Sequence, residues 1–164
     1  MMDFDEALGL FAEKSPRLTE VILELGEKRS RMSSEDDAEI ALDPLNKEYE
    51  QLANELAEIE EPFLDNFAGI IMGQMLAGFN EFDKKRDAFL RKHPFPGGKK
   101  YEKALTELLH LYSEKIEEFQ ILRLVSLNPF CERHGLDAEV ELKEFLDARS
   151  KDMKFEDRFY LQLD

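Results

Sequence analysis

The 164-residue chain has no tryptophan, one cysteine, three histidines, eight glycines and six prolines. A single cysteine cannot form an internal disulfide, which excludes the disulfide-stapled secreted scaffolds. The modest glycine and proline content, together with 13 phenylalanines, excludes collagen-like and low-complexity disordered sequences. The valine, isoleucine and threonine alternation of β-sheets is also missing. Leucine, glutamate, lysine and alanine are abundant instead, and we expect an all-α protein.

Basic residues are also scarce relative to acidic ones, with 22 Lys and Arg against 37 Asp and Glu, which gives a formal charge of −15. This excess of negative charge is not typical of nucleic-acid-binding proteins. The longest apolar run, residues 67–79, is too short to cross a bilayer. The first residues lack the basic and apolar regions of a signal peptide. We therefore expect a cytoplasmic protein with neither a nucleic acid nor a membrane as its partner.

Capping residues followed by proline mark several helix starts. Asp3 is a candidate N-cap with Glu6 three residues later, and Ser15 precedes a proline that is tolerated at a first helical position. These features predict two helices, over about 4–14 and 16–32, which form a candidate peripheral arm. Asp43-Pro44 and Asn128-Pro129 repeat the pattern, and Gly135 is expected to end the short helix that begins at the latter.

Apolar residues spaced three and four apart predict the central part of the fold. Positions 45, 49, 52, 56, 59 and 63 form one such seam, and positions 101, 105, 108, 112, 116 and 119 form another. Between them, a helix over about 63–92 is apolar nearly all round, which predicts a central helix surrounded by others. Gly69, Gly73 and Ala77 form a stripe on it where another backbone is expected to approach closely.

These features together predict a single all-α domain over 1–164. We expect one bundle of six to eight helices, with its core formed by the helices that begin near Pro44, Phe63 and Tyr101. The loop at 93–98, which contains two prolines and two glycines, separates the last two of these helices.

The acidic chain carries one basic hairpin. We expect seven of its cations to contact an anion or an acidic surface. They are Lys84, Lys85, Arg86, Arg91, Lys92, Lys99 and Lys100. The helix macrodipole favours cations at a helix C-terminus, but it disfavours Lys99, Lys100 and Lys103 at the start of the next helix. A contact with the acidic N-terminal third, in the same chain or in another copy, is the simplest interpretation, and phosphate binding is the second.

Two patterns are candidates for metal binding. Glu107 and His110 form a single ExxH motif, which is half of the ligand set that a di-iron helical bundle requires. Cys131 and His134 form a CxxH motif without the second pair that structural zinc normally uses. For the second motif we expect a buried thiol beside a surface histidine in preference to a zinc site.

A third candidate metal site consists of two carboxylate pairs. Glu24 and Glu27, followed by Asp36 and Glu39, resemble the ExxE and ExxD elements with which all-α nucleotide pyrophosphohydrolases hold magnesium, although the second pair here has the reverse order. The resemblance implies a magnesium-dependent enzyme as an alternative function. Our leading expectation includes no cofactor and no metal.

The densest acidic cluster is Glu35, Asp36, Asp37 and Glu39, and the C-terminal segment contributes the aromatic residues Phe155, Phe159 and Tyr160. A strong charge excess costs stability through self-repulsion, and a positively charged partner would relieve it. We expect these residues to bind that partner. The leading hypothesis is a non-enzymatic binding protein that neutralises or escorts a basic protein, in the manner of an immunity protein, an inhibitor or a secretion chaperone. The alternatives are a metal-dependent all-α enzyme and an oligomeric structural protein.

Overall fold

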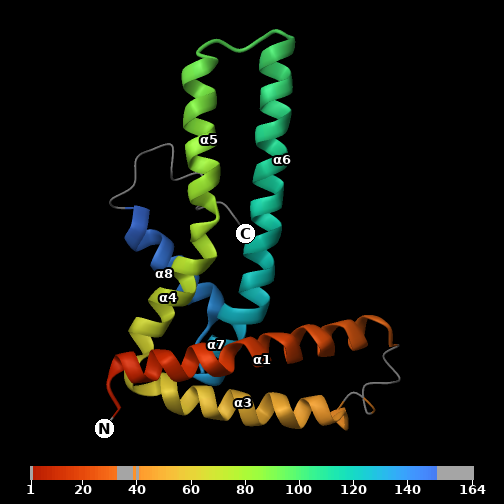
Figure 1. Cartoon of the computed structure of the whole chain (residues 1–164), viewed down its shortest axis with the longest axis vertical. Helices are drawn as coiled ribbons and strands as arrows, with labels where there is room; N and C mark the ends of the chain where they lie inside the picture. The colour runs from red at the N-terminus through yellow and green to blue at the C-terminus, as the bar shows by residue number, and fades with distance from the viewer. Residues whose placement is uncertain (1, 33–38, 40, 151–164) are drawn as a thin grey trace. The chain divides into compact units, whose positions relative to one another are not determined.

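The computed structural model describes the backbone of residues 2–32, 39 and 41–150, and the elements within these ranges are all helical (Figure 1). The all-α class is therefore confirmed, whereas the predicted number of six to eight helices is not. The elements are α1 (Phe4–Ser30), α3 (Pro44–Glu60), a 3-10 turn (Glu61–Phe63), α4 (Leu64–Ala77), α5 (Phe79–Lys92), α6 (Lys99–Leu122), a π turn (Arg123–Leu127), α7 (Asn128–Arg133) and α8 (Ala138–Ser150). Within the same ranges, none of the helices is both long and apolar enough to cross a membrane.

The chain divides into two compact units. The N-terminal unit comprises Met1–Gly69 and Val125–Asp137, and the hairpin unit comprises Ile70–Leu124 and Ala138–Asp164. The divisions fall within α4, within the π turn that follows α6, and directly before α8. The prediction of a single domain over 1–164 stays a prediction, and each unit is described separately below.

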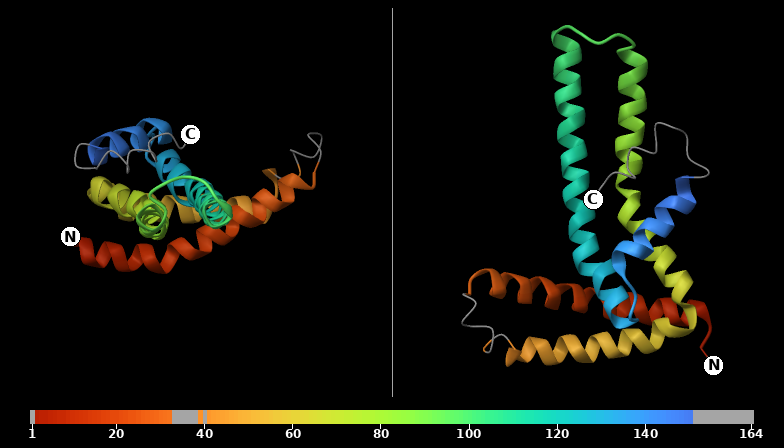
Figure 2. Two further views of the ribbon diagram at one scale, coloured as in Figure 1. Left: turned by 90° about the horizontal axis from the view of Figure 1, so that it is seen from above. Right: turned by 180° about the vertical axis from the view of Figure 1, so that it is seen from behind.

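The first helix runs without a break through Pro16, so the prediction of two helices over 4–14 and 16–32 is wrong. A proline inside a helix removes one backbone hydrogen bond and crowds the preceding turn. Packing on α3 offsets that cost, because Leu18 and Val21, which follow the proline, are buried. Lys14 and Arg17 add ion pairs with Glu55 and Glu48 of α3 at the surface. Figures 1 and 2 show α1 alongside α3, so residues 4–30 are packed on another helix of their own unit.

The predicted helix starts at Asp3 and Asp43 are confirmed. Asp3 accepts a hydrogen bond from the Glu6 amide, and the Glu6 side chain accepts one from the Asp3 amide. Asp43 accepts a hydrogen bond from the Leu45 amide at 2.9 Å, with Pro44 in the first turn of α3. In α3, Leu56 and Ile59 are the buried members of the predicted seam, which identifies the end of this helix as its core-facing part.

The predicted helix over 63–92 consists of two helices, α4 and α5, which meet at a turn on Gly78. It is also not surrounded on all sides. Phe67, Ile71 and Met75 are buried, whereas the stripe of Gly69, Gly73 and Ala77 is exposed. A Cβ atom built on Gly69 or Gly73 would have no atom of the described residues within 4 Å. The expected close approach of another helix backbone at this stripe is therefore wrong.

The hairpin unit contains α5 and α6, joined by the predicted loop at 93–98. Phe119 is the fully buried member of the second predicted seam, and its ring lies 6.1 Å from that of Phe79. Further along the hairpin, Phe82 contacts Tyr112 at 5.1 Å between ring centroids. The largest helix contacts within the described residues join α3 to α1 and α5 to α6, and the expected core of three helices stays a prediction.

The short helix α7 ends at Gly135 as predicted. Gly135 has a φ of +65°, a conformation that glycine adopts without steric cost. The Leu136 amide donates a hydrogen bond of 2.8 Å to the Cys131 carbonyl, and the Gly135 amide donates one of 3.4 Å to the Glu132 carbonyl. This pair of bonds is the Schellman motif, and it fixes the direction in which the chain leaves α7.

Candidate functional site

The described members of the predicted carboxylate pairs, Glu24, Glu27 and Glu39, are not grouped as a metal site. Arg17 approaches Glu24 at 3.8 Å, and Arg31 forms an ion pair with Glu27 one turn away. Each of these two carboxylates therefore already has a cationic partner. Asp36, from the second pair, lies outside the described residues. Across the part of the chain that the structure describes, no three His, Cys, Asp or Glu side chains are grouped so that they could hold a metal ion.

The ExxH motif lies on the surface of α6. His110 Nε2 is 3.2 Å from Glu114 Oε1, and both side chains are exposed. Glu107 lies one turn before His110 and lines a hollow on the hairpin, which is described below. The motif therefore remains half a ligand set, as its sequence suggests.

Most of the predicted partner-binding residues lie outside the described part of the chain. These are Glu35, Asp36 and Asp37, together with Phe155, Phe159 and Tyr160. Glu39 is described, and it is helical and exposed. Leu42, three residues later, has 84% of its surface exposed. An acidic and a strongly exposed apolar side chain thus lie close in sequence just before α3.

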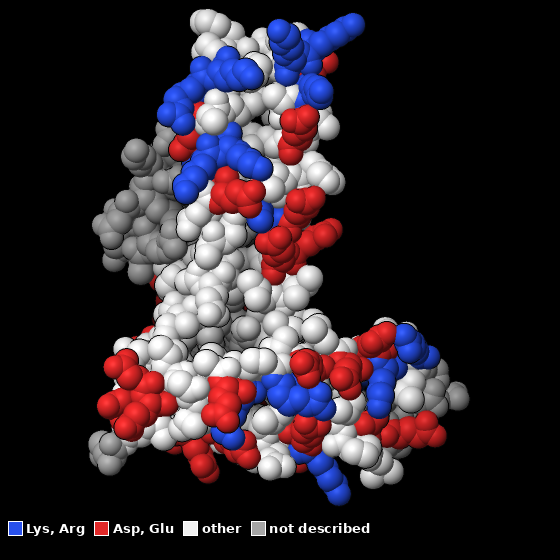
Figure 3. All heavy atoms as spheres, viewed as in Figure 1, with Lys and Arg blue, Asp and Glu red and all other residues white. Residues whose placement is uncertain are grey.

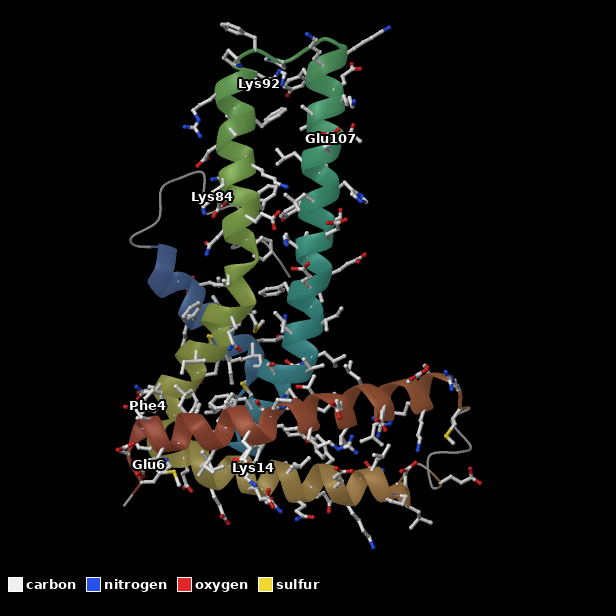
Figure 4. All side chains as sticks on the ribbon, in the orientation of Figure 1. Phe4, Glu6, Lys14, Lys84, Lys92 and Glu107 are labelled. Carbon is white, nitrogen blue, oxygen red and sulfur yellow. The ribbon has the colours of Figure 1, made fainter. Side chains whose placement is uncertain are left out.

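Ion pairs join α1 to α3 along their length. They are Lys14 with Glu55 at 2.9 Å, Arg17 with Glu48 at 2.6 Å, and Lys28 with Asp43 at 2.6 Å. Arg17 binds both carboxylate oxygens of Glu48, a bidentate geometry that fixes direction as well as distance. Figure 4 shows that Lys14 is on α1, and its partner Glu55 is on α3. The cations of α1 are therefore used largely to hold its neighbouring helix.

These ion pairs shift the pKa values of the acidic partners in one direction. The hydrogen bond from Arg17 lowers the pKa of Glu48, and the one from Lys14 lowers the pKa of Glu55. The hydrogen bond from Lys28, followed by that from the Leu45 amide, lowers the pKa of Asp43. Because the charged form is favoured in each case, the helix pair is held most strongly when these carboxylates are ionised.

A second set of carboxylates in the N-terminal unit points to solvent. We call Glu50, Glu58, Glu61 and Asp65 the acidic stripe. They follow one another at helical spacing along the outer side of α3, through the 3-10 turn and into α4. All four are exposed, and none forms an ion pair with a described side chain. Among the described residues, the stripe therefore presents negative charge that no ion pair compensates.

A buried ion pair joins the end of α3 to α7. Glu60 is completely buried, and Arg133 donates to its two oxygens at 2.8 Å each. His134 Nε2 is 3.1 Å from the same carboxylate, and the side chains of Arg133 and His134 are 5% and 6% exposed. We call these three residues the Glu60 clamp. Cys131 is a buried thiol as expected, but the expectation of a surface histidine beside it is wrong.

The seven predicted cations of the basic hairpin fall into two groups. Lys85 pairs with Glu81 at 3.3 Å, and the largely buried Arg86 lies 3.4 Å from both Asp83 and Asp87. The others are exposed and form no ion pair with the described residues: Lys84, Arg91, Lys92, Lys99 and Lys100. Figure 3 shows these charges, with blue side chains gathered at the loop end of the hairpin and red ones further along α6. The expected contact with the acidic N-terminal third stays a prediction.

A charged cluster fastens the opposite end of the hairpin. Lys115 of α6 lies 3.2 Å from Glu81 of α5 and 3.4 Å from Glu118 on its own helix. The hydrogen bond to Glu81 raises the pKa of Lys115 and lowers that of Glu81. At Gly78, a Cβ atom would lie 3.3 Å from the Glu118 carboxylate, which is a tight contact. The small residue at the turn thus leaves room for this cluster.

A hollow of about 350 Å³ lies between α5 and α6. Its apolar wall includes Ala88 and Ala104, small side chains on the two facing helices, and Lys92 and Glu107 also line it. Figure 4 shows Lys92 near the loop end of α5 and Glu107 on α6. A cation and an anion thus border an apolar space that two larger side chains would fill.

Comparison with known proteins gives no relative, because no family model, curated protein or solved structure matches this chain.

Proposed function

We propose that this chain is a non-enzymatic, cytoplasmic binding protein whose acidic N-terminal unit holds a basic protein partner. The observation that supports this proposal most is the division of charges within that unit. Its inward cations are bound to carboxylates between α1 and α3, whereas the acidic stripe has no cationic partner among the described residues.

Acidic side chains greatly outnumber basic ones in the N-terminal part of the chain. Residues 1–60 contain 17 acidic side chains and 6 basic ones. Lys14, Arg17, Lys28 and Arg31 already form ion pairs within the unit. The remaining carboxylates produce a negative surface potential that attracts a cationic protein and speeds its encounter.

Exposed apolar side chains of the same unit supply the second requirement of a protein interface. Leu42 is 84% exposed and Leu23 is 49% exposed, and both belong to the N-terminal unit. Binding energy in protein complexes is concentrated in a few apolar or aromatic contacts, and charged residues around them contribute mainly to rate and specificity. The proposed partner is therefore a basic protein that also presents an apolar patch.

Immunity proteins, inhibitors and secretion chaperones are the functional classes in which we place the chain by analogy. In each class a client protein is neutralised or escorted through contacts, without a chemical step by the binding protein. The proposal therefore needs no catalytic group and no cofactor.

The test compares two variants that lose the same charge. The stripe variant carries Glu50→Gln, Glu58→Gln, Glu61→Gln and Asp65→Asn. The control variant carries Glu102→Gln, Glu107→Gln, Glu114→Gln and Glu117→Gln, all on the exposed surface of α6. A partner captured from the native host is purified, and its affinity for each variant is measured directly.

We expect the partner to be basic, and the stripe variant to bind it about tenfold or more weakly, through slower association. The control variant should bind within about threefold of the wild type, and added salt should weaken binding because it screens exposed charges. Equal losses in both variants would show that only bulk charge matters. Turnover of nucleoside triphosphates with magnesium that Glu24→Gln abolishes would instead support the enzyme alternative.

A further inference from the structure

The loop end of the α5–α6 hairpin exposes an aromatic side chain. Phe95 lies between two prolines and has 81% of its surface exposed. Proline restricts the backbone on both sides, so the ring is held outward on a short loop with limited conformational freedom. A single exposed apolar side chain is ordinary on a protein surface. What distinguishes Phe95 is its place on a restrained loop at the end of the hairpin, with cations on both sides.

Cations surround this aromatic residue on both sides of the loop. We call residues 91–103 the hairpin tip. It contains Arg91, Lys92, Lys99, Lys100 and Lys103 against a single acid, Glu102. The five cations are exposed, and none of them forms an ion pair with a described side chain.

The hairpin is long enough to separate these cations from its acidic end. Asp87 lies four residues before Arg91 and Glu107 four residues after Lys103, so these two carboxylates border the tip. Glu114 is 15 positions beyond Lys99 on α6, which corresponds to about 22 Å along the helix. Charges in solvent are screened over about 8 Å at physiological ionic strength. The tip therefore acts as a locally cationic surface although the whole chain is strongly acidic.

We propose that the hairpin tip docks on an anionic phospholipid surface, with Phe95 inserted between the headgroups and the flanking cations against lipid phosphates. Phe95 protrudes on a loop, so its burial by a protein would require a matching cavity in that partner, whereas a bilayer deforms around it. Cations on both sides of a single apolar residue match the two layers of a membrane surface, with charge at the headgroups and apolar chains beneath.

This docking adds a peripheral membrane contact to the function proposed above and revises the expectation of no membrane partner. That expectation was based on the absence of an apolar run long enough to span a bilayer, a property that surface docking does not require. The acidic stripe belongs to the other unit, so binding of a basic partner and docking on lipid use different residues.

The absence of tryptophan in the chain provides a direct probe. In Phe95→Trp, the only indole lies at the proposed point of insertion, and Leu109→Trp places it at another exposed apolar position of the same hairpin. Each protein is mixed with vesicles of phosphatidylcholine alone or with added phosphatidylserine. We expect a blue shift, and quenching by brominated lipid chains, for Phe95→Trp with phosphatidylserine vesicles only. Leu109→Trp should remain unchanged.

Vesicle sedimentation of the full chain tests the cations. Lys99→Gln with Lys100→Gln should weaken binding roughly tenfold to thirtyfold, because each basic residue near an anionic surface contributes substantially to attachment. The matched control is Arg29→Gln with Lys47→Gln, which removes two exposed cations of the N-terminal unit and should leave binding within twofold. Phe95→Ser should weaken binding, whereas Leu109→Ser should not.

Several results would overturn the proposal. The full chain could bind both kinds of vesicle equally, or the control variant could lose as much vesicle binding as Lys99→Gln with Lys100→Gln. Phe95→Trp could also sediment with vesicles without a change in its fluorescence. Binding to an RNA or DNA oligonucleotide in place of vesicles, abolished by Lys99→Gln with Lys100→Gln, would assign the tip to nucleic acid. Self-association without vesicles that the same substitutions abolish would assign it to a second copy. None of these results bears on the partner of the acidic stripe, so the two proposals fail separately.

Discussion

Replacing Glu60 with leucine removes the carboxylate that holds α3 to α7 and leaves a buried guanidinium without its partner. Glu60 is completely buried, and Arg133 is bound to both of its oxygens at 2.8 Å. Loss of one member of a buried ion pair costs about 3–5 kcal/mol, because the other charge remains in a medium of low polarity. Against a typical total of about 5–15 kcal/mol, we expect Glu60→Leu to remove about a fifth or more of the unfolding free energy.

The double variant Glu60→Leu with Arg133→Met separates the ion pair from the packing around it. It removes both charges and replaces them with apolar groups, so we expect it to be more stable than Glu60→Leu by about 2 kcal/mol or more. Glu58→Leu is the control, because Glu58 lies on the same helix and is exposed, and it should change stability by no more than about 0.5 kcal/mol.

Urea unfolding followed by far-ultraviolet circular dichroism measures these differences, and hydrogen exchange resolved by peptide locates them. In Glu60→Leu we expect faster exchange at 56–63 and 128–136, within the N-terminal unit, and little change at 85–110 in the hairpin unit. The reasoning would be refuted if Glu60→Leu cost less than about 1 kcal/mol, or if the double variant were the less stable of the two.

Three other perturbations test separate parts of the structure. Gly73→Ala should raise the unfolding free energy by about 0.5–1 kcal/mol, because alanine favours the helix and its methyl group meets open space. A lower unfolding free energy would mean that another helix packs on the stripe of Gly69 and Gly73. Because Arg17 lowers the pKa of Glu48 in the folded protein, this carboxylate takes up a proton in the unfolded chain at a higher pH than in the folded one. The urea midpoint should therefore drop as pH falls below the ordinary pKa of 4.5, and Arg17→Gln should reduce that drop. Ala104→Leu should raise the urea midpoint by filling the hollow, with a gain of about 0.5–2 kcal/mol, and a lower midpoint would mean that the space is already filled.

Local chemistry was the most reliable guide to this fold. The caps at Asp3 and Asp43 and the glycine end at Gly135 were predictable, because each depends on hydrogen bonds within a few residues. The apolar seams predicted which sides of α3 and α6 pack. The same local rules failed at Pro16, because packing with a distant helix, which buries Leu18 and Val21, outweighs a local break signal.

Long-range features could not be predicted from spacing. Glu60 and Arg133 are 73 residues apart, and nothing near either one marks it as buried. The stripe of Gly69 and Gly73 was also misleading, because small residues at helical spacing occur both at close crossings and on open faces. Only the three-dimensional structure distinguishes these two environments.

The candidate site was only partly predictable for a related reason. Composition identified an excess of acidic residues, but it could not separate those that bind Arg17 and Lys14 from those that face solvent. The exposure of Phe95 had a usable signal, since a Pro-Phe-Pro sequence between two basic segments predicts a protruding loop. The charges of that hairpin alone indicate an ionic contact, whereas the charges together with the protruding ring indicate a membrane surface.

The central claim, that the acidic stripe meets the lysines of a basic partner, is tested most directly by zero-length carbodiimide crosslinking of the complex followed by mass spectrometry. This chemistry joins only carboxylates and amines that are in contact. We expect crosslinks from partner lysines to Glu50, Glu58, Glu61 and Asp65, and their loss at high salt. Crosslinks confined to Glu102, Glu107 and the other carboxylates of α6 would contradict the claim.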